Sequence, residues 1–176
     1  MTATTAVVRG ATPADADGIG GVHVRSWQAA YVGVVPQQFL DGLSVERRAG
    51  SWRRVIERGG AERVWVVEEG ARVRGFASVG PARDEDLPAG SGELYAIYLE
   101  PEAWSIGLGR QLFATATADL RERGFRPLIL WVLTDNERGR RFYEAAGWRH
   151  DGTRRVLDFD GTAIEEIRYR PASSDT

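Results

Sequence analysis

The sequence contains neither cysteine nor lysine, so all 23 of its Lys and Arg residues are arginines. The missing cysteines exclude disulfides, thiolate nucleophiles and cysteine-based metal sites. The missing lysines leave no side-chain amine that could be acylated on the chain itself. The only two histidines, His23 and His150, lie too far apart in sequence to suggest a local zinc pair. We therefore expect a protein that binds no metal.

A strong excess of charge of one sign is also missing, and so are long apolar runs. The formal net charge is −2, and the arginines are scattered among acidic residues instead of forming one basic stripe, so no nucleic-acid partner is expected. No apolar run approaches the length that crosses a bilayer, and residues 1–8 lack the pattern of a signal peptide. These features predict a cytoplasmic protein without a membrane partner.

A chain of 176 residues is typical of one domain. Neither an internal repeat nor a linker divides it. We expect this domain to cover residues 1–170 and to be followed by a small, polar and flexible tail over residues 171–176.

The N-terminal part predicts a short strand at residues 7–8, followed by a helix that starts at Thr12-Pro13 and runs to about Ala30. Along this helix, side chains at four-residue steps form one mostly aromatic stripe: Ile19, His23, Trp27 and Tyr31. Such a stripe is typical of core packing. Alternatively, the polar ends of its last three members could line a binding pocket.

The rest of the chain alternates between patterns typical of helices and of strands. A helix is expected over 44–57, strands over 63–68 and 72–80, and a loop over 81–92 that is acidic at residues 84–86. That loop is interpreted as solvated surface, with attraction of a cationic ligand as the alternative. A βαβα order and a hairpin follow, as strand 93–99, helix 107–123, strand 127–133, helix 136–146, and strands 148–157 and 162–170. The βαβα order predicts neighbouring parallel strands, whose carboxyl ends commonly bind ligands.

Gly107-Leu108-Gly109 stands at the first of these strand-to-helix junctions. The two glycines let the backbone approach a ligand closely, and the free N–H groups and positive dipole end of the helix face the same point. The turn therefore predicts a phosphate-binding site, although an ordinary tight turn can have the same sequence.

A second strand-to-helix junction contains Asn136 and Tyr143, which lie seven residues apart and project along nearly the same helical face. Gly139 lies between them, and a glycine costs about 1 kcal/mol relative to alanine inside a helix. We interpret it either as room for a ligand along this face or as an exposed glycine without a role. Thr134 and Glu137 have the spacing of a capping box.

These residues resemble the GCN5-related N-acetyltransferase (GNAT) family, whose members transfer an acetyl group from acetyl-CoA to a primary amine. The run ELYAIYLEPEAWSIGLGR at residues 93–110 is similar to the family's pyrophosphate motif. The run LWVLTDNERGRRFYEAAGW at residues 130–148 is similar to its second conserved block. Residues 8–17 and 23–31 also look like the N-terminal part of family members, so the resemblance covers most of the chain.

The phosphate loop departs from the family pattern at two positions. The family usually has Gly-Arg or Gly-Lys directly before the first loop glycine, and here Ser105-Ile106 stands there. Trp104 takes the position of a Gln or Arg in the family, as Trp does in one branch of the family, and is not counted as a departure. Because most of the cradle consists of backbone N–H groups, the departure is expected to weaken CoA binding without abolishing it.

The resemblance implies a single α/β (α+β) domain with a mixed, mostly antiparallel central sheet flanked by helices and a splayed parallel strand pair at the acetyl-CoA site. It implies that the strand end pairs with the pantetheine arm and offers an N–H to the thioester oxygen. It also implies that the loop N–H groups hold the pyrophosphate. The residues expected to bind acetyl-CoA are Ile97, Tyr98, Leu99, Trp104, Ser105, Ile106, Gly107, Leu108, Gly109, Arg110, Asn136 and Tyr143.

The chemistry of the reaction suggests two catalytic residues. A lysine-like amine has a pKa of about 10.4 and must lose a proton before it attacks a thioester. Glu93 is the candidate base, because two-residue alternation would place it on one face with Tyr95, Ile97 and Leu99; a surface carboxylate is the alternative. Tyr143 is the candidate general acid for the leaving thiolate, with simple packing as the alternative.

The predicted function is that of an acetyl-CoA-dependent N-acetyltransferase in which the amine attacks directly within a ternary complex. The alternative is a non-catalytic acyl-CoA-binding regulatory module whose pyrophosphate loop has drifted. The acceptor would be a small-molecule or peptide amine, and the family suggests a homodimer. The candidate acceptor-binding residues are His23, Trp27, Tyr31 and Tyr95.

Overall fold

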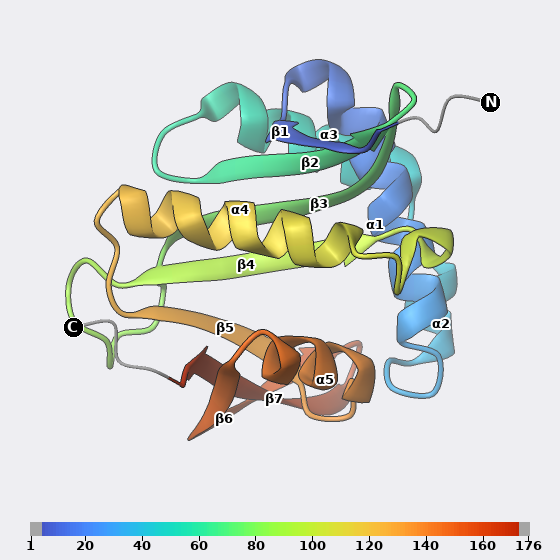
Figure 1. The fold of residues 1–176 in the computed structure, drawn as a ribbon. Coiled ribbons are helices and arrows are strands. Elements are labelled where there is room, and N and C mark those ends of the chain that lie inside the picture. Colours follow the sequence, from blue (N-terminus) through green and yellow to red (C-terminus); the bar gives the residue numbers. More distant parts are fainter. Residues whose placement is uncertain (1–4, 173–176) are drawn as a thin grey trace.

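The computed structural model describes residues 5–172 and shows one seven-stranded sheet in the order β1-β2-β3-β4-β5-β7-β6 (Figure 1). Only β4 and β5 run parallel, and every other neighbouring pair is antiparallel. The prediction of a mixed, mostly antiparallel sheet is therefore confirmed. The strands are β1 (Val7–Gly10), β2 (Arg63–Glu69), β3 (Arg72–Pro81), β4 (Gly92–Leu99), β5 (Leu128–Leu133), β6 (Trp148–Phe159) and β7 (Thr162–Pro171).

Helices cover both faces of this sheet (Figure 1). On one face lie α1 (Ala16–Ala30) and α3 (Val45–Arg58), and on the other lie α4 (Leu108–Glu122) and α5 (Glu137–Ala145). A short helix, α2 (Gln37–Asp41), was not expected from the sequence. Two single 3-10 turns, η1 (Pro13–Asp15) and η2 (Pro101–Ala103), lead into α1 and toward α4.

Local sequence signals set the helix boundaries. The Thr12 N–H donates to Asp15 Oδ2 at 2.7 Å, so the chain turns at Thr12 and Pro13 as predicted. The Ser44 hydroxyl accepts the Arg47 N–H at 3.2 Å and caps α3. Each contact satisfies a backbone donor that has no partner inside its helix.

Two apolar layers hold the helices against the sheet. The larger lies under α4 and α5 and contains Leu112, Leu120, Trp148 and Tyr169, which are almost completely buried. A second lies between α1 and the opposite face and centres on Phe76, Ile19 and Val22. The sheet is therefore covered on both faces along its middle, which fixes where β4 and β5 can separate.

The acidic loop between β3 and β4 is held by a buried arginine. Arg168, 3% exposed on β7, forms ion pairs with Asp84 and Asp86 at 2.8 Å and with Asp151 at 2.7 Å. Two of the three acidic residues expected at 84–86 therefore already have a cationic partner within the chain. This arrangement ties the loop to the C-terminal hairpin.

Residues 171 and 172, which were expected in the flexible tail, continue the C-terminal hairpin. Pro171 belongs to β7, and the Ala172 N–H donates to the Gly147 carbonyl at 2.8 Å; residues 173–176 lie outside the described part. Within residues 5–172, no helix is both long and apolar enough to cross a membrane. The same residues contain no group of three or more His, Cys, Asp or Glu side chains placed to hold a metal ion.

Candidate functional site

The parallel strands β4 and β5 separate after only three paired residues. Their ladder runs from Gly92–Leu128 to Leu94–Leu130. At the same level, the register between β3 and β4 shifts, since Val79 faces Leu94 while Ser78 faces Ala96. Tyr95 is therefore an extra residue in β4, and such a bulge bends a strand and increases its twist. The predicted splay of the parallel pair is present and begins at this bulge.

The bulge also reverses which side chains of β4 share a face. Leu94, Ile97 and Leu99 all pack in the apolar layer under α4, whereas Ala96 and Tyr98 pack on the α1 side. Glu93, the neighbour of Leu94, therefore points to the α1 side with Ala96 and Tyr98. The expectation that Glu93 shares a face with Ile97 and Leu99 was wrong, because an extra residue shifts a two-residue alternation by one.

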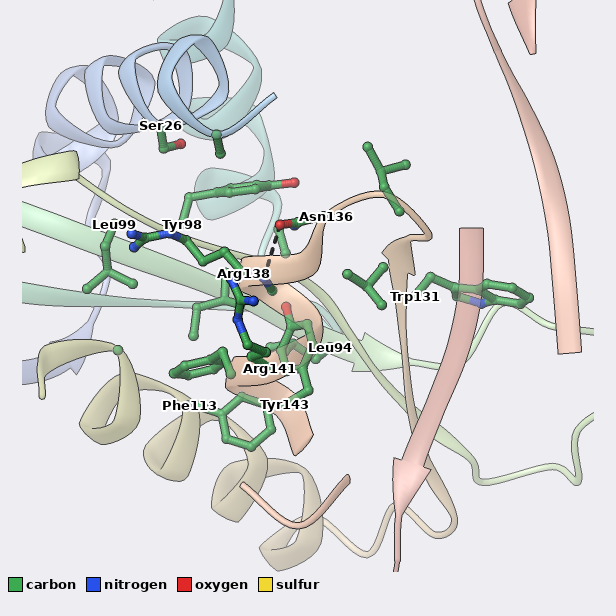
Figure 2. Close-up of a pocket in the computed structure, with 18 of the residues that line it drawn as sticks. Ser26, Leu94, Tyr98, Leu99, Phe113, Trp131, Asn136, Arg138, Arg141 and Tyr143 are labelled. Atoms are coloured by element: carbon green, nitrogen blue, oxygen red, sulfur yellow. Dashed lines mark hydrogen bonds between the residues drawn. The ribbon is translucent and has the colours of Figure 1, made fainter. Parts of the chain in front are cut away.

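A cleft of about 970 Å³ occupies the space opened by the splay and reaches both sides of the sheet. Figure 2 shows Tyr98, Asn136, Arg138 and Tyr143 around this space, with Trp131 apart from them. On the α4–α5 side, the lining includes Ile97, Leu99, Trp104, Ser105, Gly107, Gly109, Arg110, Phe113, Asn136, Arg138, Gly139, Arg141, Phe142 and Tyr143. On the α1 side, it includes Trp27, Tyr31, Arg83, Glu93, Tyr95, Tyr98, Trp131, Leu133, Arg155, Leu157, Phe159 and Glu166.

The loop before α4 presents a row of backbone donors to the cleft. The first hydrogen bond of α4 runs from the Gln111 N–H to the Gly107 carbonyl at 3.2 Å. The N–H groups of residues 105–110 have no acceptor among residues 5–172. Gly107, with φ of 92°, takes a left-handed conformation at the N-cap of α4, which sets the direction of the chain as it enters the helix. The geometry matches an anion cradle at a helix N-terminus, although Ile106 and Leu108 do not line the cleft with their side chains.

The residue before this turn carries backbone strain. Ser105 has φ of 64°, a left-handed conformation that suits glycine. The family's usual glycine at this position would adopt that conformation without a Cβ penalty. The replacement of glycine by Ser105 therefore strains the backbone in addition to changing the side chain.

Arginines beside the cradle offer charge that the loop itself lacks. The guanidinium carbon of Arg138 lies 3.9 Å from the centroid of the Trp104 ring, and the Trp104 indole N–H donates to the Leu99 carbonyl at 3.1 Å. Arg110 and Arg141 also line the cleft. The sequence analysis missed Arg138 and Arg141, although both lie within two residues of Gly139 in the second motif and could have been read from it.

Asn136 caps α5 and explains the glycine that follows it. Its Oδ1 accepts the Gly139 N–H at 3.0 Å. A Cβ on Gly139 would lie 2.6 Å from Asn136 Nδ2, so the glycine makes room for this side chain. The predicted capping box was wrong, because the Thr134 hydroxyl donates to Glu165 Oε1 at 3.0 Å instead. A local cap from Asn136 replaced the one expected from Thr134.

Tyr143 lies in the wall of the cleft with its phenol available. Its side chain is 9% exposed and packs edge-on against Phe142 with 5.4 Å between ring centroids. Its hydroxyl makes no hydrogen bond to any residue in 5–172. Burial raises the pKa of Tyr143 above its ordinary value. The phenol is therefore protonated at neutral pH and can donate a hydrogen bond into the cleft.

The aromatic stripe of α1 divides between cleft and core. Trp27 and Tyr31 line the cleft, but His23 does not. His23 Nδ1 accepts the Trp52 indole N–H at 3.0 Å, and burial lowers the pKa of His23 to about 3. His23 is therefore a neutral core residue, which favours core packing over acceptor binding at this position. Tyr95 lines the cleft, with its hydroxyl donating to the Pro81 carbonyl at 2.5 Å.

Two carboxylates line the cleft, and both belong to its α1 side. Glu93 is 1% exposed and accepts hydrogen bonds from Arg83. Glu166, from β7, pairs with Arg155 of β6 at 2.8 Å. The sequence analysis missed Glu166 and Arg155. They reach the cleft only because β7 inserts between β5 and β6, and no local pattern indicates that insertion.

Known proteins resemble this chain in sequence and in fold. The model of the acetyltransferase (GNAT) family matches residues 27–148. The uncharacterized N-acetyltransferase YuaI of Bacillus subtilis is 37% identical over 130 residues, which cover 73% of this chain and 72% of YuaI.

Two solved structures share the fold at lower sequence identity. The PaiA N-acetyltransferase of Thermoplasma acidophilum, crystallised in complex with coenzyme A, superposes with a TM-score of 0.74 at 19% identity, covering 93% of this chain and 98% of PaiA. The putative acetyltransferase YncA of Salmonella typhimurium, solved with its cofactor acetyl-CoA, gives a TM-score of 0.71 at 20% identity, covering 98% and 97%.

Proposed function

The chain belongs to the GNAT family of acetyltransferases, and we propose that it transfers the acetyl group of acetyl-CoA to a primary amine by direct attack within a ternary complex. The observation that carries this proposal is the single cleft through the sheet. It joins the loop at residues 105–110, whose N–H groups have no acceptor among residues 5–172, to a buried phenol at Tyr143. A donor molecule with a phosphate end and a thioester end matches such a cleft.

The described residues fit acetyl-CoA along the α4–α5 side. The N–H groups of 105–110 would hold the pyrophosphate, with Arg138 and Arg110 adding positive charge. The β4 edge at residues 97–99, freed by the splay, would pair with the pantetheine arm. Acetyl-CoA supplies an acetyl group on a good leaving group, and the binding of coenzyme A or acetyl-CoA by PaiA and YncA supports the same assignment.

Tyr143 would protonate the thiolate that leaves. Its phenol keeps its proton at neutral pH because burial raises its pKa. It has no competing hydrogen-bond partner among residues 5–172, so it is free to donate where negative charge develops on sulfur. Asn136 Oδ1 is occupied by the Gly139 N–H, which leaves its amide N–H groups for the pantetheine arm.

The base is less clearly assigned to Glu93 than the sequence suggested. The Arg83 side chain and backbone donate to its two carboxylate oxygens, at 2.7 Å to Oε1 and at 3.1 and 3.3 Å to Oε2. A carboxylate with both oxygens engaged must give up a charged partner before it takes a proton. The role of Glu93 as the base stays a prediction. Its pairing with Arg83 favours a role in holding neighbouring groups in position.

Direct attack fits the side chains of the cleft. Cysteine is absent from the sequence, and the Ser26 hydroxyl, which reaches the cleft, donates to the His23 carbonyl at 3.0 Å. Ser105 belongs to the phosphate loop. Neither serine lies beside a base, so nothing in this wall resembles an activated nucleophile.

An amine screen tests the proposal. Thiol release from acetyl-CoA is measured with a panel of primary amines, and the acetylated products are identified by mass. Because the chain has no lysine, the enzyme offers no side-chain amine of its own to be acetylated. Amine-dependent release with a matching product mass is expected. Binding of acetyl-CoA without release for any acceptor would favour the non-catalytic module, and no rise in melting temperature with CoA would exclude both.

A further inference from the structure

The two carboxylates of the cleft differ in how fully they are paired. Arg83 donates to both oxygens of Glu93. At Glu166, Arg155 Nε donates to Oε2 at 2.8 Å, and Oε1 accepts no hydrogen bond from any residue in 5–172. The Glu166 side chain is only 13% exposed. Glu166 lines the cleft, and its Oε1 has no donor among the described residues, so this oxygen is available to a cationic ligand.

Aromatic side chains surround the position of Glu166. It faces Leu133 across the β5–β7 ladder, and Leu133 packs in one cluster with Tyr31, Trp27 and Phe159. Burial raises the pKa of Tyr31, and the nearby charge of Glu166 contributes to that shift. Aromatic faces next to a carboxylate bind an ammonium group on an apolar body well.

The other charges on the α1 side of the cleft already have partners. Arg83 pairs with Glu93. Arg155 pairs with Glu166, lies 3.8 Å from Asp84 and stacks at 4.1 Å from the centroid of the Trp131 ring. A carboxylate on the acceptor would therefore have to share an arginine that already pairs with a carboxylate, and a second ammonium would find no further carboxylate oxygen of the cleft without a donor.

We propose that Glu166 Oε1 binds the ammonium of the acceptor and takes its proton, and that the acceptors are monoamines with an apolar or aromatic body. This inference rests on the proposed function. It assigns the base to a residue that the sequence analysis did not consider, and it separates the acceptor class from amino acids and from polyamines by charge alone.

The proton and electron balance is simple. One N–H bond of the ammonium breaks as its proton moves to Glu166 Oε1, which frees the nitrogen lone pair. The amine then attacks the thioester carbon, so that a C–N bond forms and the C–S bond breaks. Tyr143 gives its proton to the sulfur and is restored by the second proton lost from nitrogen, directly or through solvent. Glu166 releases its proton to water.

Substitution of Glu166 tests both of its proposed roles, the binding of the ammonium group and the removal of its proton. Glu166→Gln keeps the shape of the side chain and is expected to lower kcat/KM for 2-phenylethylamine about 100-fold, within the range of general-base catalysis. The matched control is Glu165→Gln, the preceding residue on β7, which is 39% exposed, pairs with Arg154 and accepts the Thr134 hydroxyl, a bond that the amide oxygen of glutamine can still accept. The control should stay within about twofold of wild type, as surface substitutions usually do. Calorimetry with acetyl-CoA checks that the donor site of each variant is intact.

A comparison of three acceptors with the wild-type protein tests the proposed acceptor class without any variant. Its result can be interpreted even if Glu166→Gln fails to fold. The acceptors share one aromatic ring: 2-phenylethylamine, phenylalanine with an added carboxylate, and 1,4-bis(aminomethyl)benzene with a second amine. The first should exceed both others in kcat/KM by about tenfold or more, because each extra charge would enter the cleft without a partner of its own.

Each result has one meaning. Preference for phenylalanine or the diamine overturns the acceptor class. Wild-type rates in Glu166→Gln, or a large loss in Glu93→Gln alone, overturn the role of Glu166 while the acetyltransferase function stands. If Glu166→Gln changes only KM, the role of Glu166 in binding the ammonium stands and its role in proton transfer is overturned. Failure of wild type with every amine of the wider screen overturns the proposed function itself.

Discussion

Replacing Ile106 by arginine should tighten CoA binding about fivefold. Ile106 is 60% exposed, so the substitution removes little packing. An arginine there would stand among the unpartnered N–H groups of residues 105–110. A solvent-exposed ion pair is worth about 0.2–1 kcal/mol, and a pyrophosphate offers more than one charge. The gain should therefore be about 1 kcal/mol, which is about fivefold in Kd.

Titration calorimetry with CoA measures this effect, and Val7→Arg provides the control. Val7 is 54% exposed on the edge strand β1, so its substitution adds the same charge away from the loop. The fivefold gain of Ile106→Arg should shrink at about 0.5 M salt, where the Debye length is only about 4 Å. An unchanged Kd, or an equal change in Val7→Arg, would refute the reasoning and show that the backbone donors alone set the affinity.

Three further substitutions probe the mechanism, the loop and the fold. Tyr143→Phe should lower kcat about 100-fold while the Kd of acetyl-CoA stays within about twofold; equal kcat values would remove Tyr143 from the reaction. Ser105→Gly should raise the free energy of unfolding in urea by up to about 1 kcal/mol, because φ is 64° there; a loss of stability would contradict the strain. A hydrogen bond from Arg9 lowers the pKa of Asp15 to about 2, so the ionised carboxylate stabilises the fold above about pH 4 and this contribution is lost as the pH falls toward 2. Asp15→Asn should therefore lower Tm at pH 7, with a difference from wild type that shrinks on acidification in calorimetric scans; a constant difference would disprove the linkage.

The part of the candidate site that we assign to the donor could be predicted because its residues are close in sequence. Residues 104–110 and Asn136 to Tyr143 each form one strand-to-helix junction. Their glycines, caps and spacing fix local geometry before any long-range contact is made. The same holds for the helix starts at Thr12 and Ser44, where the capping contacts lie within three residues.

The α1 side of the cleft could not be predicted, because its residues come from separate parts of the chain. Glu166 reaches the cleft only through the strand order β5-β7-β6, and a hairpin sequence does not say which strand it will join. The bulge at Tyr95 leaves no local signature, yet it moves Glu93 to the other face of the sheet. Glu93 was placed by strict alternation, and one inserted residue was enough to invert that placement.

A buried carboxylate helps to hold the loop before α4 in place. Glu100 follows β4 directly and is fully buried, where it forms ion pairs with Arg25 of α1 and with Arg72 and Arg74 of β3. Although burial opposes ionisation, the hydrogen bonds from these arginines lower the pKa of Glu100. Its N–H also donates to the Arg74 carbonyl at 2.8 Å.

This contact set fixes the start of the loop from two neighbouring elements before residues 105 and 106 are reached. The N–H groups that follow are therefore directed by the end of β4 and by the first turn of α4. The two unusual residues alter the charge and strain of the cradle and leave its donors in place. If the cleft binds acetyl-CoA as proposed, the loop departure should tune the affinity for the donor, and the choice of acceptor should be made across the sheet, at Glu166.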